Sequence, residues 1–298
     1  ILVFIISICI LANYLIEAKR NRDINDNIRD LHETSYSVIT EATTTAPTET
    51  ETEIITTAPP PLVLLDGMAP VVNENPNTAG WIIVPNTNID YAVLQYEDND
   101  FYLNHNFYGK YSEAGSIYAD FRCRVNYYND EQSDNIVIYG HNQADGSMFG
   151  TLKKYKVTHQ NSKNFQFYLD NPTFYFSNLY EEYTYKIVAI FIIEVLPEQT
   201  RDGIIFDYHN YVRFKEPNRS FDTFKENVLA RTAIDTGVDF EYGDKFITLS
   251  TCSNEFDQSR LVVIGRRVRE GEDPSVDTSL ATLNEDAIEP DFDFIYSR

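Results

Sequence analysis

The feature that most constrains this chain is a series of short apolar runs, rich in aromatic and β-branched residues, that turn-forming residues separate. The chain holds 21 Tyr and 19 Phe, which are residues favoured in strands. The runs predict strands at 81–84, 91–95, 116–119, 135–139, 165–169, 173–176, 183–195, 245–251 and 260–268. Eight or nine short strands with few helices indicate a mainly β fold, and a closed β-barrel is the typical way to leave no open edge.

Helical periodicity is rare in this region. The clearest interior helix is predicted over 220–233, where Phe221, Phe224 and Val228 share one face. Thr223 and Glu226 have the spacing of a capping box. A short helix is predicted over 148–155.

The N-terminal region divides into three parts. Residues 1–16 are nearly all apolar, and although a span needs about 20 residues, we expect a truncated transmembrane anchor here; a cleaved signal peptide is the alternative. Residues 17–39 predict a polar juxtamembrane helix with a narrow apolar stripe. Residues 40–65 are rich in Thr, Glu and Pro and predict an extended stalk.

The C-terminal region, 270–298, is strongly acidic. It predicts a disordered tail, although Phe292, Phe294 and Tyr296 near its end leave docking open as an alternative. The formal net charge of the chain is −22, which argues against a nucleic-acid partner because a phosphate backbone requires basic patches.

Three side chains in the β-rich region suggest nucleophilic chemistry. Cys252 ends one predicted strand, Arg260 opens the next, and His141 follows a third. A thiol, a guanidinium and an imidazole at strand ends can supply a nucleophile, an oxyanion donor and a proton donor. With Cys9 in the apolar N-terminal run, only Cys123 and Cys252 belong to the globular part, so the cysteines do not form a disulfide framework.

Each of these residues also has a structural interpretation. Cys252 is equally compatible with a buried structural cysteine, His141 with a solvated turn, and Arg260 with a surface ion pair. Cys123, which lies between two arginines, is an alternative thiol, and His105 is the main alternative histidine.

Five motifs in order distinguish these interpretations. They are G-W-I-I-V-P-N-T-N-I-D-Y-A-V-L-Q from Gly80, D-N-D-F-Y-L-N-H-N-F from Asp98, G-S-I-Y-A-D from Gly115, Y-G-H-N-Q-A-D-G-S-M-F from Tyr139, and T-L-S-T-C followed eight residues later by Arg260. Together they resemble the class B sortases, over about 66–269. The resemblance implies an eight-stranded sortase barrel with a helix between strands six and seven.

The resemblance also implies site residues. His141, Cys252 and Arg260 match the catalytic positions of the family. Substrate-binding positions are implied at Asn99, Leu103, Ser250 and Thr251. Ser253 departs from some class B members, which carry an acidic residue directly after the cysteine.

The implied function is a cysteine transpeptidase on the outer face of a Gram-positive cell membrane, held by a single N-terminal span. It would cleave a C-terminal sorting motif of exported proteins and transfer the Thr carboxyl through a thioacyl intermediate to an amine of a peptidoglycan precursor or a pilin. No cofactor and no metal is expected.

Two alternatives remain at this stage. An L,D-transpeptidase-like enzyme also uses Cys and His, but its motif has a histidine and a glycine just before the cysteine, whereas Leu249, Ser250 and Thr251 stand here. A non-catalytic surface β-barrel that serves as a binding module does not require Cys252, His141 and Arg260 together.

Overall fold

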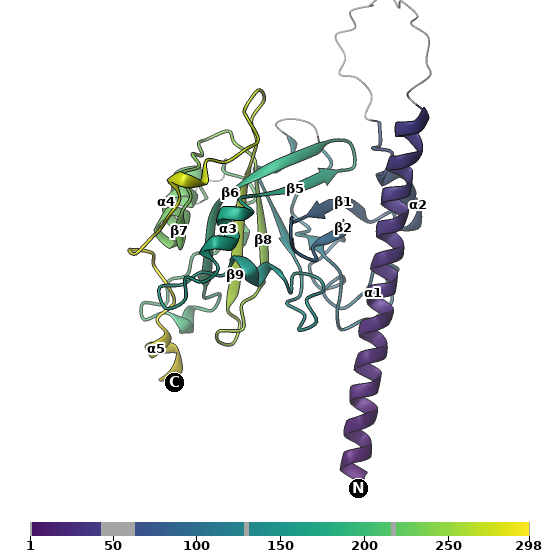
Figure 1. The fold of residues 1–298 in the computed structure, drawn as a ribbon. Coiled ribbons are helices and arrows are strands. Elements are labelled where there is room, and N and C mark those ends of the chain that lie inside the picture. The colour runs from purple at the N-terminus through teal and green to yellow at the C-terminus, as the bar shows by residue number, and fades with distance from the viewer. Residues whose placement is uncertain (1, 43–62, 128–130, 216–218, 298) are drawn as a thin grey trace, which may run out of the picture.

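Eight strands close into a barrel in the computed structural model, which describes residues 2–42, 63–127, 131–215 and 219–297 (Figure 1). Their order around the barrel is β1-β2-β3-β4-β8-β9-β6-β5. The barrel strands are β1 (Thr78–Ile83), β2 (Asp90–Leu94), β3 (Tyr118–Ala119), β4 (Asn135–Tyr139), β5 (Thr173–Asn178), β6 (Glu182–Ile193), β8 (Phe246–Cys252) and β9 (Arg260–Arg267). The predicted closed eight-stranded barrel is therefore confirmed.

The pairing of the strands determines which strand ends lie together at each end of the barrel. Strands β4 and β8 are parallel, as are β2 and β3, while the other barrel pairs are antiparallel. The carboxyl ends of β4 and β8 therefore lie at the same end of the barrel. The amino end of β9 joins them there because β8 and β9 are antiparallel.

Apolar side chains fill both faces of the central strands. Inside the barrel, Ile138, Leu249 and Val263 belong to one buried cluster. Outside it, Phe246 and Ile264 pack against the helix α4 (Phe221–Arg231) in a second cluster. Burial on both faces explains why β4, β8 and β9 read as nearly continuous apolar runs.

Helix α4 follows β6 and precedes β8, as predicted. Its start differs from the expectation. Ser220 is the N-cap residue, and its hydroxyl accepts a hydrogen bond from the Thr223 backbone N–H at 3.2 Å. The predicted capping box at Thr223 and Glu226 was wrong because those residues already lie within the first helical turns.

One predicted strand is a helix. Residues 165–169 form most of α3 (Phe165–Asp170), in which Tyr168 is buried in the interior cluster. Aromatic residues favour strands only where a neighbouring strand can pair with them, and here helical spacing turns Tyr168 inward. The short helix predicted over 148–155 is present only as the 3₁₀ turn η2 (Leu152–Tyr155).

Several short elements complete the described part of the chain. They are α2 (Met68–Glu74), η3 (Pro197–Gln199), η4 (Tyr208–Asn210), β7 (Ile234–Asp235), η5 (Thr278–Leu280), β10 (Thr282–Leu283) and α5 (Phe292–Tyr296). Strands β7 and β10 pair with each other outside the barrel.

The N-terminal region is one helix, α1 (Leu2–Ala42), which runs along one side of the barrel (Figure 1). His32 stacks on Trp81 of β1 with ring centroids 4.1 Å apart, and the Arg29 side chain pairs with Asp90 of β2 at 3.2 Å. Among the described residues, none of the helices combines the length and the apolar character that crossing a membrane requires, so the expected transmembrane anchor at 1–16 is not confirmed. Most of the predicted stalk at 40–65 lies outside the described residues.

The acidic C-terminal segment packs back onto the domain. The Asn284 backbone N–H donates to the Ala233 carbonyl at 3.0 Å, and the Ile288 N–H donates to the Ala230 carbonyl at 2.7 Å. Docking, rather than a detached tail, is the interpretation that these contacts support.

Candidate active site

Strands β8 and β9 bring two of the three predicted catalytic residues side by side. Cys252 is the last residue of β8, Arg260 is the first of β9, and the two are Cα partners across the antiparallel pair. The loop between them is closed at its base, where the Ser253 and Ser259 hydroxyls lie 2.6 Å apart. The sulfur and the guanidinium therefore start from adjacent points on the barrel rim.

Strand β4 places His141 next to them. Tyr139 of β4 is the parallel partner of Ser250 in β8, so His141 and Cys252 each lie two residues beyond this pair. The following residue, Asn142, donates from its side-chain amide to the Cys252 carbonyl at 2.8 Å. The structure thus brings Cys252, His141 and Arg260 together at one end of the barrel.

The ring of His141 is oriented by a backbone carbonyl. Its Nε2 lies 2.9 Å from the Leu103 carbonyl oxygen, which can only accept, so Nε2 carries the hydrogen in this contact. The backbone of Leu103 therefore contacts His141. Its half-buried side chain packs against the cluster that contains Tyr102. This is the position at which the sequence predicts a wall of the substrate groove.

Asn99 is held by a buried carboxylate. Its side-chain amide donates to Asp120 at 3.0 Å, and its carbonyl oxygen accepts from the Phe121 backbone N–H at 3.0 Å. Asp120 is fully buried and also binds the Arg122 guanidinium at 2.7 Å and the Tyr139 hydroxyl at 3.0 Å. This network fixes the side chain of Asn99 beside Asp120.

Charge balance determines the state of Asp120. Burial alone would raise the pKa of this carboxyl, but the hydrogen bonds and positive charge of Arg122, together with the Asn99 amide, outweigh burial and hold the pKa below its ordinary value. Asp120 is thus an anion within the barrel wall. No sequence pattern singled out Asp120, although it ends the motif that begins at Gly115.

Ser250 and Thr251 are nearly inaccessible, at 2% and 3% exposure. The Ser250 hydroxyl pairs with the Tyr208 hydroxyl at 2.7 Å, and the Thr251 hydroxyl donates to the Gly140 carbonyl at 2.7 Å. In this structure both hydroxyls hold β8 to its neighbours. Their predicted contact with substrate stays a prediction.

Two buried tyrosines lie within electrostatic range of both Cys252 and Arg260. Burial, above all, raises the pKa of Tyr118 and raises that of Tyr208 to about 12. Both phenols are therefore neutral hydrogen-bonding groups at pH 7. Sequence reasoning missed Tyr208 because it lies in the long connection after β6, where no strand end marks it.

The competing candidates have structural roles. Cys123 is 5% exposed, and burial raises the pKa of its thiol to about 12 despite the adjacent arginines. The ring of His105 stacks on Phe101 with centroids 4.2 Å apart, and its Nδ1 lies 2.6 Å from the Phe101 carbonyl. Neither Cys123 nor His105 is placed for chemistry at the rim.

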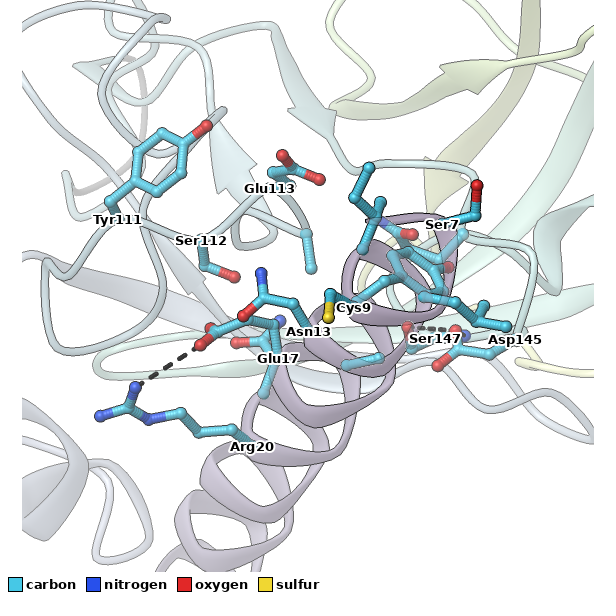
Figure 2. Close-up of a pocket in the computed structure, with 17 residues that line it drawn as sticks. Ser7, Cys9, Asn13, Glu17, Arg20, Tyr111, Ser112, Glu113, Asp145 and Ser147 are labelled. Carbon is cyan, nitrogen blue, oxygen red and sulfur yellow. Dashed lines mark hydrogen bonds and ion pairs between the residues drawn. The ribbon is translucent and has the colours of Figure 1, made fainter. Parts of the chain in front are cut away.

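A separate pocket of about 1140 Å³ opens between α1 and the loops that face it (Figure 2). Cys9, Asn13 and Glu17 of α1 line one side, and Asp145 and Ser147 lie across from them. None of the three catalytic candidates lines this pocket. Within the described ranges, His, Cys, Asp and Glu side chains do not gather in threes that could hold a metal ion.

Comparison with known proteins identifies the family. Residues 82–268, more than half of the chain, match the family model described as the Sortase domain. This chain belongs to the sortase family. It is 33% identical over 196 residues to Sortase B of Listeria monocytogenes, a match that covers 65% of this chain and 71% of that protein. It is 27% identical over 198 residues to Sortase B of Staphylococcus aureus, covering 65% of this chain and 72% of the relative.

The fold of this sortase agrees with that assignment. The crystal structure of sortase B from Bacillus anthracis in complex with AAEK1 matches with a TM-score of 0.62 at 25% identity, covering 86% of this chain and 99% of the other. The chain is accordingly a class B sortase, that is, a cysteine transpeptidase of the family that acts on surface proteins bearing a sorting motif. These matches favour this assignment over the L,D-transpeptidase and binding-module alternatives.

Proposed function

We propose that this class B sortase uses Cys252 as nucleophile, Arg260 as oxyanion donor and His141 as general acid and base. The observation that carries the proposal is the strand register. Cys252 and Arg260 are Cα partners, and His141 occupies the equivalent position on the parallel neighbour of β8. Three groups of complementary chemistry thus share one rim.

The first half-reaction forms the acyl-enzyme. The Cys252 thiolate attacks the carbonyl carbon of the Thr residue in the sorting motif, and a sulfur–carbon bond forms while the carbonyl electrons move to oxygen. Arg260 donates hydrogen bonds to this oxyanion, since its guanidinium offers several donors in a fixed plane. When the intermediate collapses, the carbon–nitrogen bond breaks and protonated His141 gives its proton to the departing amine.

The second half-reaction returns the enzyme to its starting state. An acceptor amine attacks the thioester carbonyl, its proton passes to His141, and the carbon–sulfur bond breaks to release the thiolate. A thioester keeps the acyl group activated, so that an amine competes with water. We propose an amine of a peptidoglycan precursor or of a pilin lysine as the acceptor.

Asn99, Leu103, Ser250 and Thr251 are proposed to border the sorting-motif groove. Support comes from their positions around the rim: Leu103 contacts His141, and Ser250 and Thr251 directly precede Cys252. Asn99 is oriented by Asp120. In this proposal Asn99 and Leu103 contribute through the loop that faces His141, and Ser250 and Thr251 mainly set the position of Cys252.

We also propose that the protein acts at the cell membrane, with the apolar start of α1 in contact with lipid and the catalytic domain outside the cell. The apolar residues Phe4, Ile10 and Ile16 of α1 are all more than half exposed in the described structure, which suits a lipid environment better than water. Membrane fractionation of the producing cells tests this. Recovery of the full chain in the aqueous fraction contradicts the proposed location.

A peptide panel tests the proposed chemistry. The full chain is incubated in detergent with LPxTG-like and NPxTx-like peptides and an amine acceptor, and products are followed by mass spectrometry. We expect one motif class to give an amide product and a transient mass increase on the peptide that contains Cys252. Hydroxylamine should release this adduct because it cleaves thioesters.

Cys252→Ala is the matched control for the panel. It should give neither the adduct nor the product. Product formation by Cys252→Ala at the wild-type rate, or an adduct that maps to Cys9 or Cys123, contradicts the assignment of the nucleophile.

A further inference from the structure

The C-terminal segment, residues 284–297, runs from α4 to the active-site rim. Asn284 is fixed at its start, where its side-chain amide donates to the Thr232 carbonyl at 2.9 Å. The adjoining strand β10 pairs with β7. In Figure 1 the last helix of the chain, α5, lies on the opposite side of the barrel from α1. The segment is thus attached at one end before it approaches the rim.

The far end of this segment contacts the loop that joins Cys252 to Arg260. The Phe292 ring packs edge-on against the Phe256 ring with centroids 6.0 Å apart. The Tyr296 hydroxyl donates to the Glu255 carbonyl. Both contacts fall within residues 253–259, which we name the catalytic loop.

Neighbouring loops are joined to the same assembly. Asp291 pairs with Arg201 of the β6–α4 connection at 2.6 Å, and the Gln199 side chain donates to the Asp257 carbonyl at 2.6 Å. Glu289 accepts from the His159 backbone N–H at 2.7 Å. Because the Arg201–Asp291 pair is largely exposed, it contributes little by itself. The aromatic contact and the backbone hydrogen bonds are therefore the main restraints.

The catalytic loop has a conformation that needs such restraints. Asn254 and Gln258 have φ angles of 61° and 59°, in the left-handed region that non-glycine residues seldom adopt. Residues in this region persist where their surroundings hold them in place. The hydroxyl pair of Ser253 and Ser259 holds the base of the loop, and Phe292 and Tyr296 contact its middle.

We propose that the C-terminal segment is a brace for the catalytic loop, in which Phe292 and Tyr296 act as positioning residues for Cys252 and Arg260. The inference rests on the proposed function only in that kcat is taken to measure turnover of the sorting peptide by Cys252. Neither residue is expected to touch substrate. Without the brace, a smaller fraction of molecules holds the guanidinium in line with the thiol.

Phe292→Ala in the full chain is the principal test. Hydrogen–deuterium exchange should become on the order of tenfold faster in peptides from the catalytic loop and stay unchanged in β1 and β2, because loss of a contact opens its own region first. With the best peptide of the panel, kcat should fall by about 3- to 10-fold while KM changes by less than about twofold, since alignment rather than binding is lost. Phe292→Tyr, which keeps the ring, should restore both.

Matched variants make the test independent of folding defects. Tyr296→Phe removes only one hydroxyl, so it should raise the exchange rate of the catalytic loop and lower kcat by smaller factors. This variant decides the outcome if Phe292→Ala does not fold. Tyr242→Phe, at another largely exposed tyrosine, and Leu280→Ala, earlier in the C-terminal region, should match the wild type.

Two results overturn the inference. One is unchanged exchange of the catalytic loop in Phe292→Ala and Tyr296→Phe. The other is faster exchange with unchanged kcat. Failure of the proposed function is recognised separately. In that case Cys252→Ala still turns over peptide, and this result does not depend on the exchange rate of the catalytic loop.

Discussion

The two cysteines of the globular region differ both in their sequence neighbours and in their places in the fold. Cys123 lies between two arginines, yet it is buried and burial raises its pKa to about 12. Cys252 has no arginine beside it in sequence, but the register of β8 and β9 places Arg260 across from it at the rim. Arginines beside a thiol in the sequence are thus a poor guide to whether the thiol is accessible. Of these two thiols, the one at a strand end is less buried.

The strongest test of this comparison replaces each cysteine in turn. Cys252→Ala should lower kcat/KM for the sorting peptide by about 10⁴-fold or more, because the nucleophile is lost. Cys123→Ala should keep kcat/KM within about threefold and lower the free energy of unfolding by about 1–2 kcal/mol, as expected for a small buried deletion. Peptide kinetics and urea unfolding measure the two effects. Loss of activity in Cys123→Ala with a normal fold breaks the comparison.

The second test replaces one arginine beside each cysteine, which is Arg260 across from Cys252 and Arg122 directly before Cys123. Arg260→Lys should lower kcat/KM by about 10²–10³-fold, because a single ammonium does not reproduce the planar donors facing the oxyanion. Arg122→Lys should act mainly on stability, with a loss of about 1–3 kcal/mol from weakened bonds to buried Asp120. Equal kinetic defects in the two variants contradict the division between a catalytic and a structural arginine.

The third test measures how the free energy of unfolding depends on pH through the buried carboxylate Asp120, which binds Arg122. Its folded pKa lies below the ordinary value of about 3.9, so its contribution to stability is fully present above the unfolded pKa and is lost as pH falls through the folded pKa. Between pH 7 and about pH 3, the wild type should therefore lose more free energy of unfolding than Asp120→Asn. Thermal unfolding across this range measures the difference.

Other depressed carboxyls, such as Glu272, are common to the wild type and Asp120→Asn and cancel in the comparison. If the free energy of unfolding falls with pH equally in the two proteins, Arg122 does not hold Asp120 as an anion. In that case Arg122 has no demonstrated structural role to set against the proposed catalytic role of Arg260.

Strand content was the most predictable part of this molecule. Eight of the nine predicted strands are present, because their runs are rich in β-branched, aromatic and other apolar residues that pack on both sides of a barrel wall. The exception, 165–169, carries aromatic residues but no β-branched residue, and it forms the helix α3. Aromatic residues alone therefore did not specify a strand.

Site prediction followed the same division. Cys252, His141 and Arg260 could be proposed from the sequence because they stand at strand ends within motifs, and the register places them at one end of the barrel. Tyr208 and Phe292 were not recognised as rim residues, since they reach this end of the barrel through long connections with no periodic pattern. Their proximity depends on how loops pack, a property that no local pattern encodes.

By itself, the sequence predicted a mainly β barrel and a set of candidate catalytic side chains, because β-rich apolar runs and reactive residue types are local properties of the chain. Only the tertiary structure decided which thiol is accessible, that Asp120 is a buried anion, and that the acidic C-terminal segment packs beside the catalytic loop. These depend on contacts between residues far apart in the chain, and burial and electrostatics are set by those contacts.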